Sequence, residues 1–266
     1  MYTRHFCVSA NEMIAEISRE NEKLSEMLGD FAEACAADGR NAIMVKKNNG
    51  KKCFVAGTYC GFAFLVDGTL IEILPEGERL TARKELCTEF SRRCGITFNP
   101  SGFDSDTNFM EYYISVFAEE TMKIIKSGVL STYASREENM NKVHGTILFS
   151  ENIRRNLVHR ERIYVRHDVF TSDRSENRII KAAASKLVKI TDNSHSSHLL
   201  KEALSFLDEV RVPYDIAAEF SKCINTRNTK KYSTILNICR MLLDKNEGIA
   251  FSGKYISCAQ FFCNNE

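Results

Sequence analysis

The chain has 266 residues, enough for one large or two modest domains, and its 44% hydrophobic content is ordinary for a globular protein. A formal net charge of +1 excludes a global basic field, so any DNA contact must come from a local patch or a partner. No apolar run is long enough to cross a bilayer, and the first residues carry no signal-peptide core. We therefore expect a cytoplasmic protein with no membrane partner.

Ten cysteines are present, and none forms a CxxC pair. Cys87 and Cys94 are too far apart for the spacing of common zinc ribbons, and His195 and His198 have no second ligand pair beside them. We expect free thiols that are mostly buried, and neither a metal nor a cofactor.

The first hundred residues predict a β-rich unit with a leading helix. Residues 11–36 carry apolar side chains at helical spacing and predict an amphipathic helix. Asn49-Gly50 and Asp67-Gly68 lie between strand-like runs, and both pairs favour tight hairpin turns. We expect a small antiparallel sheet or partial barrel with covering helices in an N-terminal domain, residues 1–100.

Two helices are predicted next, at 79–94 and at 108–126, and the aromatic stripe of the second is typical of a core. Residues 130–142 predict a loop. After residue 190, three further apolar patterns predict a C-terminal helical bundle. The fold class is thus α+β, with a mixed central strand region between the N-terminal sheet and the bundle.

The central stretch, residues 143–190, begins with a short apolar run at Gly145–Phe149 that predicts a strand, and it continues through a basic segment into a second strand-like run at 162–166. Asp173 then precedes a helical pattern in which Glu176 stands three residues later. This spacing predicts a capping box, with Asp173 on the free N–H groups of the first turn.

This order of Gly-Thr-Ile-Leu-Phe, a basic segment, a strand bearing Tyr164, Asp168-Val-Phe and Asn177-Arg-Ile-Ile-Lys resembles the McrC subunit of McrBC-type, 5-methylcytosine-dependent restriction systems. The similarity runs from about Gly61 to about Lys254. It implies a protein that enters the pore of a McrB-like AAA+ GTPase hexamer, stimulates GTP hydrolysis and reaches DNA through that complex.

The resemblance directs attention to candidate partner- or DNA-binding residues. Five arginines fall within thirteen positions, and the Asn-Arg pair follows. These residues are Arg154, Arg155, Arg160, Arg162, Arg166, Asn177 and Arg178. Arginine suits acidic or phosphate partners because it makes bidentate hydrogen bonds. The alternative is a solvated basic face paired with Glu151 and Glu161, and the sequence leaves open whether the segment meets protein or DNA.

McrC proteins carry a PD-(D/E)xK nuclease core, which needs two acidic residues for Mg²⁺ and a lysine. No Asp or Glu of this sequence has Lys at the second position after it, and no phosphate-binding loop of the form Gly-x-x-x-x-Gly-Lys-[Ser/Thr] occurs. We therefore expect a non-catalytic component with no catalytic residues. The sequence leaves open a natural short form, a split gene with the nuclease domain encoded separately, and a truncated reading frame.

The expected division is a McrC-like central α+β region at 101–254, followed by a truncated entry to the missing nuclease domain at 255–266. Two alternatives remain. One is an independent nucleic-acid-binding module that uses the arginines. The other is a truncated remnant of the endonuclease subunit, whose exposed Phe261 and Phe262 would promote aggregation.

Overall fold

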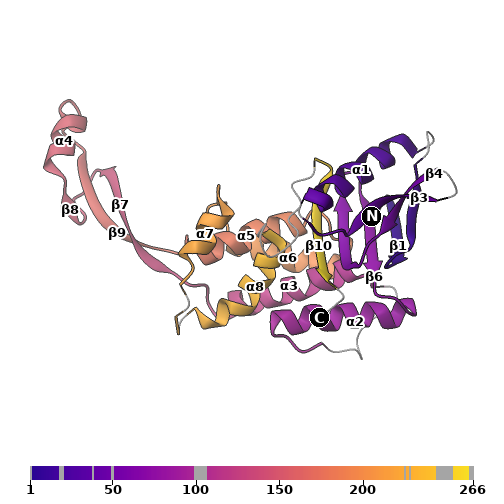
Figure 1. Cartoon of the computed structure of the whole chain (residues 1–266). Helices are drawn as coiled ribbons and strands as arrows, with labels where there is room; N and C mark the ends of the chain where they lie inside the picture. The colour runs from indigo at the N-terminus through magenta and orange to yellow at the C-terminus, as the bar shows by residue number, and fades with distance from the viewer. Residues whose placement is uncertain are drawn as a thin grey trace.

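The computed structural model describes residues 2–17, 21–37, 39–48, 51–98, 107–224, 226–227, 229–243 and 254–263. A β-rich unit and a body of helices lie side by side, and a narrow arm leaves the body on the side away from the β-rich unit (Figure 1). Helices and separate sheets along one chain confirm the α+β class. In the described residues, no helix combines the length and apolar character needed to span a lipid bilayer.

The larger sheet of the β-rich unit has the strand order β1-β6-β5-β10. Its strands are β1 (Arg4–Ser9), β6 (Thr69–Leu74), β5 (Tyr59–Leu65) and β10 (Ile256–Cys263). The hairpin predicted around Asp67-Gly68 is confirmed, because β5 and β6 pair antiparallel across it. The sheet is mixed rather than antiparallel throughout, since β1 pairs parallel with β6.

The smaller sheet has the order β2-β4-β3, and its strands are β2 (Met13–Glu16), β4 (Lys51–Ala56) and β3 (Ile43–Asn48). The β3–β4 hairpin confirms the prediction, although its turn residues Asn49-Gly50 lie outside the described residues. The helix predicted at 11–36 is wrong in its first part. Pairing of β2 with β4 outweighs the local helical periodicity, and α1 (Glu22–Ala37) begins only at Glu22.

The helical body contains the helices predicted at 79–94 and 108–126 and those of the C-terminal bundle. Its elements are α2 (Arg79–Cys94), α3 (Phe109–Lys126), α5 (Ser175–Leu187), α6 (Ser194–Phe206), α7 (Ile216–Lys222), the 3₁₀ turn η3 (Lys230–Tyr232) and α8 (Ser233–Leu243). Phe109, Tyr113 and Phe117 of α3 are fully buried, so its aromatic stripe is core, as predicted.

A buried ion pair fastens the larger sheet to the helices. Glu72 of β6 accepts hydrogen bonds from Arg83 of α2 at 2.7 Å and from the backbone N–H of Phe109 at 2.7 Å. Burial alone would raise the pKa of Glu72, but hydrogen bonds from His5 and Arg83 outweigh it and hold that pKa to about 2. The carboxylate is therefore ionised although its side chain has no exposed surface.

Strand β10 brings the end of the chain back to the first sheet, where it pairs antiparallel with β5. Phe261 and Phe262 are each only 4% exposed. The expectation that these two side chains are exposed is therefore wrong, because the sheet and its covering elements bury both. Gly61 permits this pairing, since a Cβ there would lie 1.9 Å from the Gln260 carbonyl oxygen.

Nine of the cysteines are free thiols whose side chains the structure describes, and seven of these nine are buried, as the sequence predicted for most. Burial raises the pKa of Cys258 to about 11 and that of Cys94 to about 12. These thiols stay protonated near neutral pH and behave as small apolar side chains.

Candidate functional site: the arm and its root

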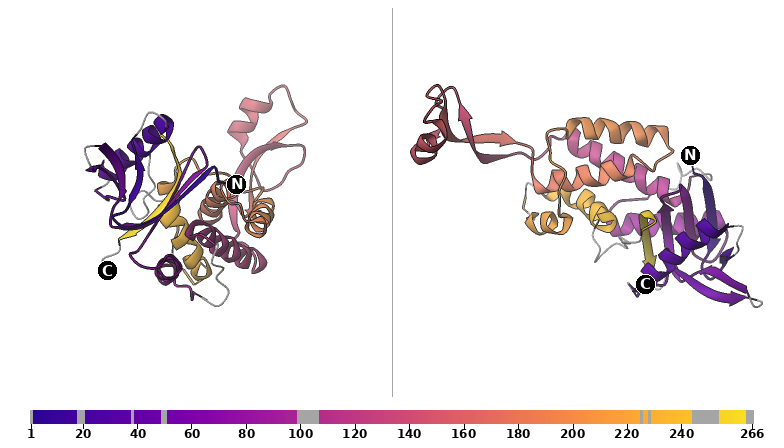
Figure 2. Two further views of the ribbon diagram at one scale, coloured as in Figure 1. Left: turned by 90° about the vertical axis from the view of Figure 1, so that its right-hand side faces the viewer. Right: turned by 90° about the horizontal axis from the view of Figure 1, so that it is seen from above.

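The arm comprises residues 132–171 and projects well clear of the helical body (Figures 1 and 2). It contains β7 (Thr132–Met140), β8 (Thr146–Ile147), α4 (Phe149–Asn156) and β9 (Ile163–Thr171). Strands β7 and β9 pair over nine residues, from Thr132 opposite Thr171 to Met140 opposite Ile163. At about 3.4 Å per residue the ribbon is about 30 Å long.

The arm corrects two sequence expectations. The loop predicted at 130–142 is strand β7, whose polar sequence gave no alternation because most of the strand is exposed. The strand expected through Phe149 stops at Ile147, and the basic segment that follows is helix α4. The strand predicted at 162–166 is confirmed as the first part of β9.

Asparagine side chains fasten α4 to the ribbon. Asn156 is buried and exchanges hydrogen bonds of 2.7 Å with Asn139 of β7. Asn152 accepts a hydrogen bond from the Tyr164 backbone N–H of β9 at 2.8 Å. Gly145 turns the chain toward α4 with a φ of +81°, and a Cβ there would lie 2.3 Å from the Arg166 carbonyl oxygen. These polar contacts hold α4 against the ribbon, beside the buried side chains of Tyr164 and Val165.

Helix α4 and the two residues after it present an exposed apolar surface that we call the tip stripe: Phe149, Ile153, Leu157 and Val158. Their exposed fractions are 71%, 65%, 71% and 84%. The first three recur at every fourth position, which places them on one side of the helix. Large apolar side chains gathered on an exposed helix face are typical of a contact surface for another protein.

All five predicted arginines lie on the arm, and all five are exposed. Arg154 and Arg155 both bind Glu151, at 2.8 and 2.9 Å, and Arg166 of β9 binds Glu137 of β7 at 2.6 Å. In the described part of the chain Arg160 makes no ion pair. The structure thus places all five arginines on the arm, and it gives several of them local glutamate partners. Exposed ion pairs of this kind contribute about 0–1 kcal/mol, so a binding partner can replace them.

Asn177 lies at the other end of the arm, at its root, and is fully buried. Its side-chain amide donates to the carbonyl oxygens of Leu130 at 2.9 Å and Ser172 at 2.7 Å, just before β7 and just after β9. The Tyr232 hydroxyl donates to Asn177 Oδ1 at 3.0 Å and accepts from the Leu130 N–H at 2.9 Å. We call Asn177 and Tyr232 the root clamp, because together they join both legs of the arm to the body.

Charged side chains reinforce the leg of the arm that follows β9. Asp173 binds Arg178 at 2.7 Å and accepts from the Arg211 backbone N–H at 3.0 Å, and Arg178 lies 3.3 Å from Glu219. The hydrogen bond from Arg178 is the largest cause that holds the pKa of Asp173 well below its usual range. Asp173 is therefore not the predicted helix cap: Arg174 occupies that position, without a capping hydrogen bond from its side chain.

The structure therefore separates the seven predicted site residues into two groups. The arginines lie along the arm, whereas Asn177 and Arg178 lie at its root, where burial and internal bonds suit a positioning role better than direct contact. Sequence reasoning missed the tip stripe and Tyr232. The spacing of Phe149, Ile153 and Leu157 was a usable signal, but the run before Glu151 predicted a strand.

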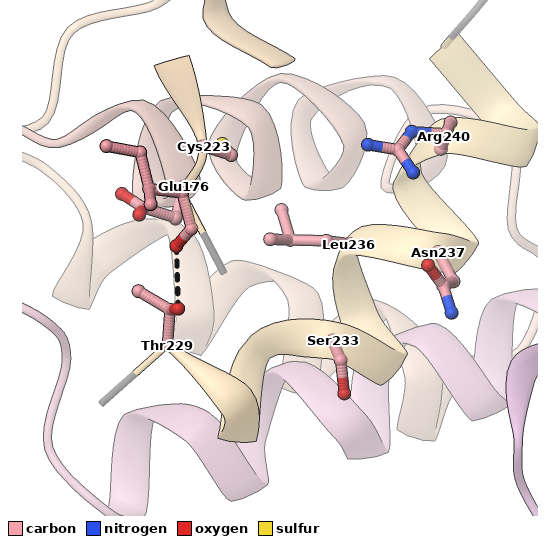
Figure 3. A pocket seen from close by; sticks show the side chains of 8 residues that line it. Glu176, Cys223, Thr229, Ser233, Leu236, Asn237 and Arg240 are labelled. Carbon is pink, nitrogen blue, oxygen red and sulfur yellow. Dashed lines mark hydrogen bonds between the residues drawn. The ribbon is translucent and has the colours of Figure 1, made fainter. Parts of the chain in front are cut away.

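A cavity of about 150 Å³ lies between α5, α7 and α8 (Figure 3). Its lining consists of Glu176, Cys223, Ile224, Thr229, Ser233, Leu236, Asn237 and Arg240. Glu176 is already paired with Arg174 at 3.1 Å, and Thr229 donates to the Ile224 carbonyl oxygen at 2.8 Å. Binding sites for cofactors and other small molecules are usually about 300–1,000 Å³, so this cavity is small for a nucleotide. Across the described ranges, no three His, Cys, Asp or Glu side chains form a group that could hold a metal ion.

Comparison with known proteins relates this chain to one protein family and to two solved structures. A protein-family model described as McrBC 5-methylcytosine restriction system component matches residues 55–263, from the smaller sheet through the arm to β10. No curated protein matches the sequence.

Two solved assemblies contain chains of similar fold, both from Thermococcus gammatolerans. A chain of the McrBC complex, determined by cryo-electron microscopy, has a TM-score of 0.71 and 15% identity, and the match covers 97% of this chain and 83% of that one. A chain of the refined half-complex from a tetradecameric assembly of McrB AAA+ hexamers with bound McrC has a TM-score of 0.70 and 17% identity, with coverage of 98% and 67%. The TM-scores show a shared fold, and with identities this low the likeness to these two chains is one of fold alone.

Proposed function

Because the chain belongs to the family of McrBC 5-methylcytosine restriction system components, we propose that it is a McrC-like subunit that uses its arm to engage a McrB-like AAA+ GTPase ring. The family match and the shared fold confirm the resemblance found in the sequence. In the proposed role the arm enters the central channel of the ring and stimulates GTP hydrolysis.

The single observation that carries this proposal is the shape and surface of the arm. A ribbon about 30 Å long reaches away from the body and ends in exposed apolar side chains. Burying each large side chain of the tip stripe in a partner would contribute about 1.5–3 kcal/mol before the costs of ordering. A channel through a ring suits a narrow element with an apolar end, because it can surround the tip on all sides.

The arginines behind the tip stripe suggest the chemistry of the channel wall. Their present partners, Glu137 and Glu151, are themselves partly exposed and bound only through surface ion pairs. Acidic side chains on a surrounding ring could take over these guanidinium groups in bidentate geometry. We therefore propose a channel that is apolar where the tip stripe rests and acidic where the arginines pass.

Stimulation of the ring requires more than attachment of the tip, because the arm must also be held firmly to the helical body. We propose that the root clamp holds it there. Since Asn177 and Tyr232 bind both legs of the arm, a force on the tip is transmitted to the helical body rather than absorbed at a loose hinge. In the proposed role, neither Asn177 nor Arg178 needs to contact the partner directly.

We further propose that these 266 residues regulate cutting without performing it. The sequence has no acidic residue two positions before a lysine, which a PD-(D/E)xK site needs. DNA would then be cut by a nuclease domain within the assembled complex, encoded separately if not elsewhere on the same polypeptide.

The test measures GTP turnover by the McrB-like AAA+ protein of the same organism with and without this chain. We expect stimulation by the wild-type chain and a loss of about tenfold or more in apparent affinity for Ile153→Asp, because a charge replaces a buried contact. Val66→Asp is the matched control, since Val66 is 56% exposed but lies in the β5–β6 turn, remote from the arm. The absence of stimulation by the wild-type chain would refute the proposed function.

The same preparation tests the non-catalytic role. Incubated alone with Mg²⁺ and 5-methylcytosine-containing DNA, the chain should leave the DNA intact. Metal-dependent strand cleavage that co-purifies with the monodisperse protein would refute this part of the proposal while leaving the role of the arm open to its own test.

A further inference from the structure

The β3–β4 hairpin carries a concentration of positive charge that the proposed role of the arm does not use. Residues 39–66 contain five basic side chains and no Asp or Glu. Four of the five are Lys46 and Lys47 on β3 and Lys51 and Lys52 on β4, all exposed. The hairpin lies at the end of the molecule opposite the arm, as Figure 1 and the right-hand view of Figure 2 show.

The register of the hairpin brings like charges together. Lys47 is directly opposite Lys52, and such neighbours share one face of the ribbon. Lys46 is opposite Cys53, and Lys51 is opposite Asn48, so these two lysines belong to the other face. Positive charge thus lies on both faces, and the Lys47–Lys52 pair works against the stability of the hairpin.

Three of these lysines have no acidic partner in the part of the chain that the structure describes. Lys46, Lys47 and Lys52 make no ion pair there, whereas Arg154, Arg155 and Arg166 of the arm each bind a glutamate. Lysines on an edge strand commonly prevent sheets from pairing with one another, and this role fits β3. It does not account for Lys52, because β4 is the middle strand of its sheet: it is paired with β3 at this position, and the Lys52 carbonyl oxygen accepts from the Ile17 N–H on the other side at 3.0 Å.

We propose that the β3–β4 hairpin is a contact site for duplex DNA and that its lysines bind the phosphate backbone. The major groove of B-form DNA admits a two-stranded β-ribbon, and a ribbon in the groove has a phosphate strand on either side. Lysines on both faces match that arrangement. This inference goes beyond the proposed role of the arm, since it assigns the DNA contact to one end of the molecule and the ring contact to the other.

The experiment measures binding of the full chain to a fluorescein-labelled duplex by fluorescence anisotropy over a range of salt concentrations. Binding should weaken steeply with salt because lysine–phosphate contacts release counterions. Lys47→Glu should weaken binding by about tenfold and reduce the magnitude of the salt slope by about one. Lys201→Glu is the control of equal charge change, because Lys201 is exposed on α6 in the helical body.

A second measurement separates a DNA contact from a structural role. Lys47→Glu places opposite charges at the Lys47–Lys52 pair, so the melting temperature should stay constant or rise while DNA affinity falls. Equal binding by the Lys47→Glu and Lys201→Glu variants would overturn the proposal, as would no binding by the wild-type chain at low salt. Aggregation of Lys47→Glu with unchanged DNA affinity would assign the lysines to edge protection instead.

The outcome is independent of the ring. Lys47→Glu should retain full stimulation of GTP turnover, and Ile153→Asp should retain full DNA binding. If the ring proposal fails, the anisotropy result still decides whether the hairpin binds DNA. Tighter binding to single-stranded than to duplex DNA would also overturn the inference, because the ribbon would then have no groove to occupy.

Discussion

The Tyr232 hydroxyl lies 3.0 Å from Asn177 Oδ1, and through this bond a residue of η3 fixes the amide that holds both legs of the arm. Asn177 donates to one carbonyl oxygen on each leg, so its orientation cannot reverse without losing both bonds. The Asn-Arg-Ile-Ile-Lys segment that carried the family resemblance therefore begins with the residue that attaches the arm.

Replacing Asn177 with Asp tests the clamp with almost no change in shape. The carboxylate would face two carbonyl oxygens in a site without exposed surface, and both legs would lose a donor. We expect a loss of about 1–3 kcal/mol or more in the free energy of unfolding, measured by urea denaturation. Asn237→Asp is the control, since Asn237 is exposed on α8. Equal stabilities of the two variants would show that the clamp does not hold the arm.

Tyr232→Phe tests whether the two members of the clamp act together. It removes the hydroxyl that donates to Asn177 and accepts from the Leu130 N–H, and it keeps the ring. We expect about 1–3 kcal/mol of destabilisation, and a coupling energy of about 0.5–3 kcal/mol with Asn177→Asp in a double-mutant cycle. In a GTPase assay, either variant should bind the ring but stimulate it less. Strictly additive effects would mean that the two residues work independently.

Acid should destabilise the join between the sheet and the helices. The pKa of Glu72 is lowered from 4.5 to about 2 in the folded protein, so its contribution to stability is present above pH 4.5 and is lost as the pH falls toward 2. We expect Glu72→Gln to cost about 3–5 kcal/mol at neutral pH, because the largely buried charge of Arg83 loses the carboxylate that balances it. The same variant should show a shallower decline in stability below pH 4.5, and an unchanged acid profile would contradict this assignment.

Gly61→Ala tests the pairing of β10 with β5. The added methyl group would lie 1.9 Å from the Gln260 carbonyl oxygen, so the two strands must separate locally. We expect destabilisation of about 1–3 kcal/mol or more and faster hydrogen exchange in residues 256–263. Gly29→Ala provides the contrast, because nothing lies within 4 Å of a Cβ at that position in α1. That change should stabilise the protein by about 0.5–1 kcal/mol.

Local patterns predicted the parts of the fold whose partners are near in sequence. Helices α2 and α3 followed from periodicity, and the β5–β6 hairpin followed from Asp67-Gly68. Strands β1 and β10 escaped prediction because their pairing depends on segments far along the chain. Strand β7 escaped because an exposed ribbon needs no alternation of apolar and polar residues.

The candidate site likewise has one part that the sequence predicted and another part that required the fold. Clustering along the sequence was enough to find the arginines, since their proximity on the arm is largely local. The role of Asn177 required the fold, because Leu130 lies 47 positions away and Tyr232 lies 55 positions away. A short sequence motif identified the residue, but only the folded chain shows what its amide holds.

Because the register of β7 and β9 is unbroken, the length of the arm can be changed in steps of two residue pairs. Tyr133 and Ala134 lie opposite Phe170 and Val169, so deleting these two pairs would shorten the ribbon by about 7 Å and keep every remaining side chain on its original face. The body, the root and the tip would stay as they are. The depth to which the tip penetrates a surrounding channel thereby becomes an adjustable variable, separable from the chemistry of the contact.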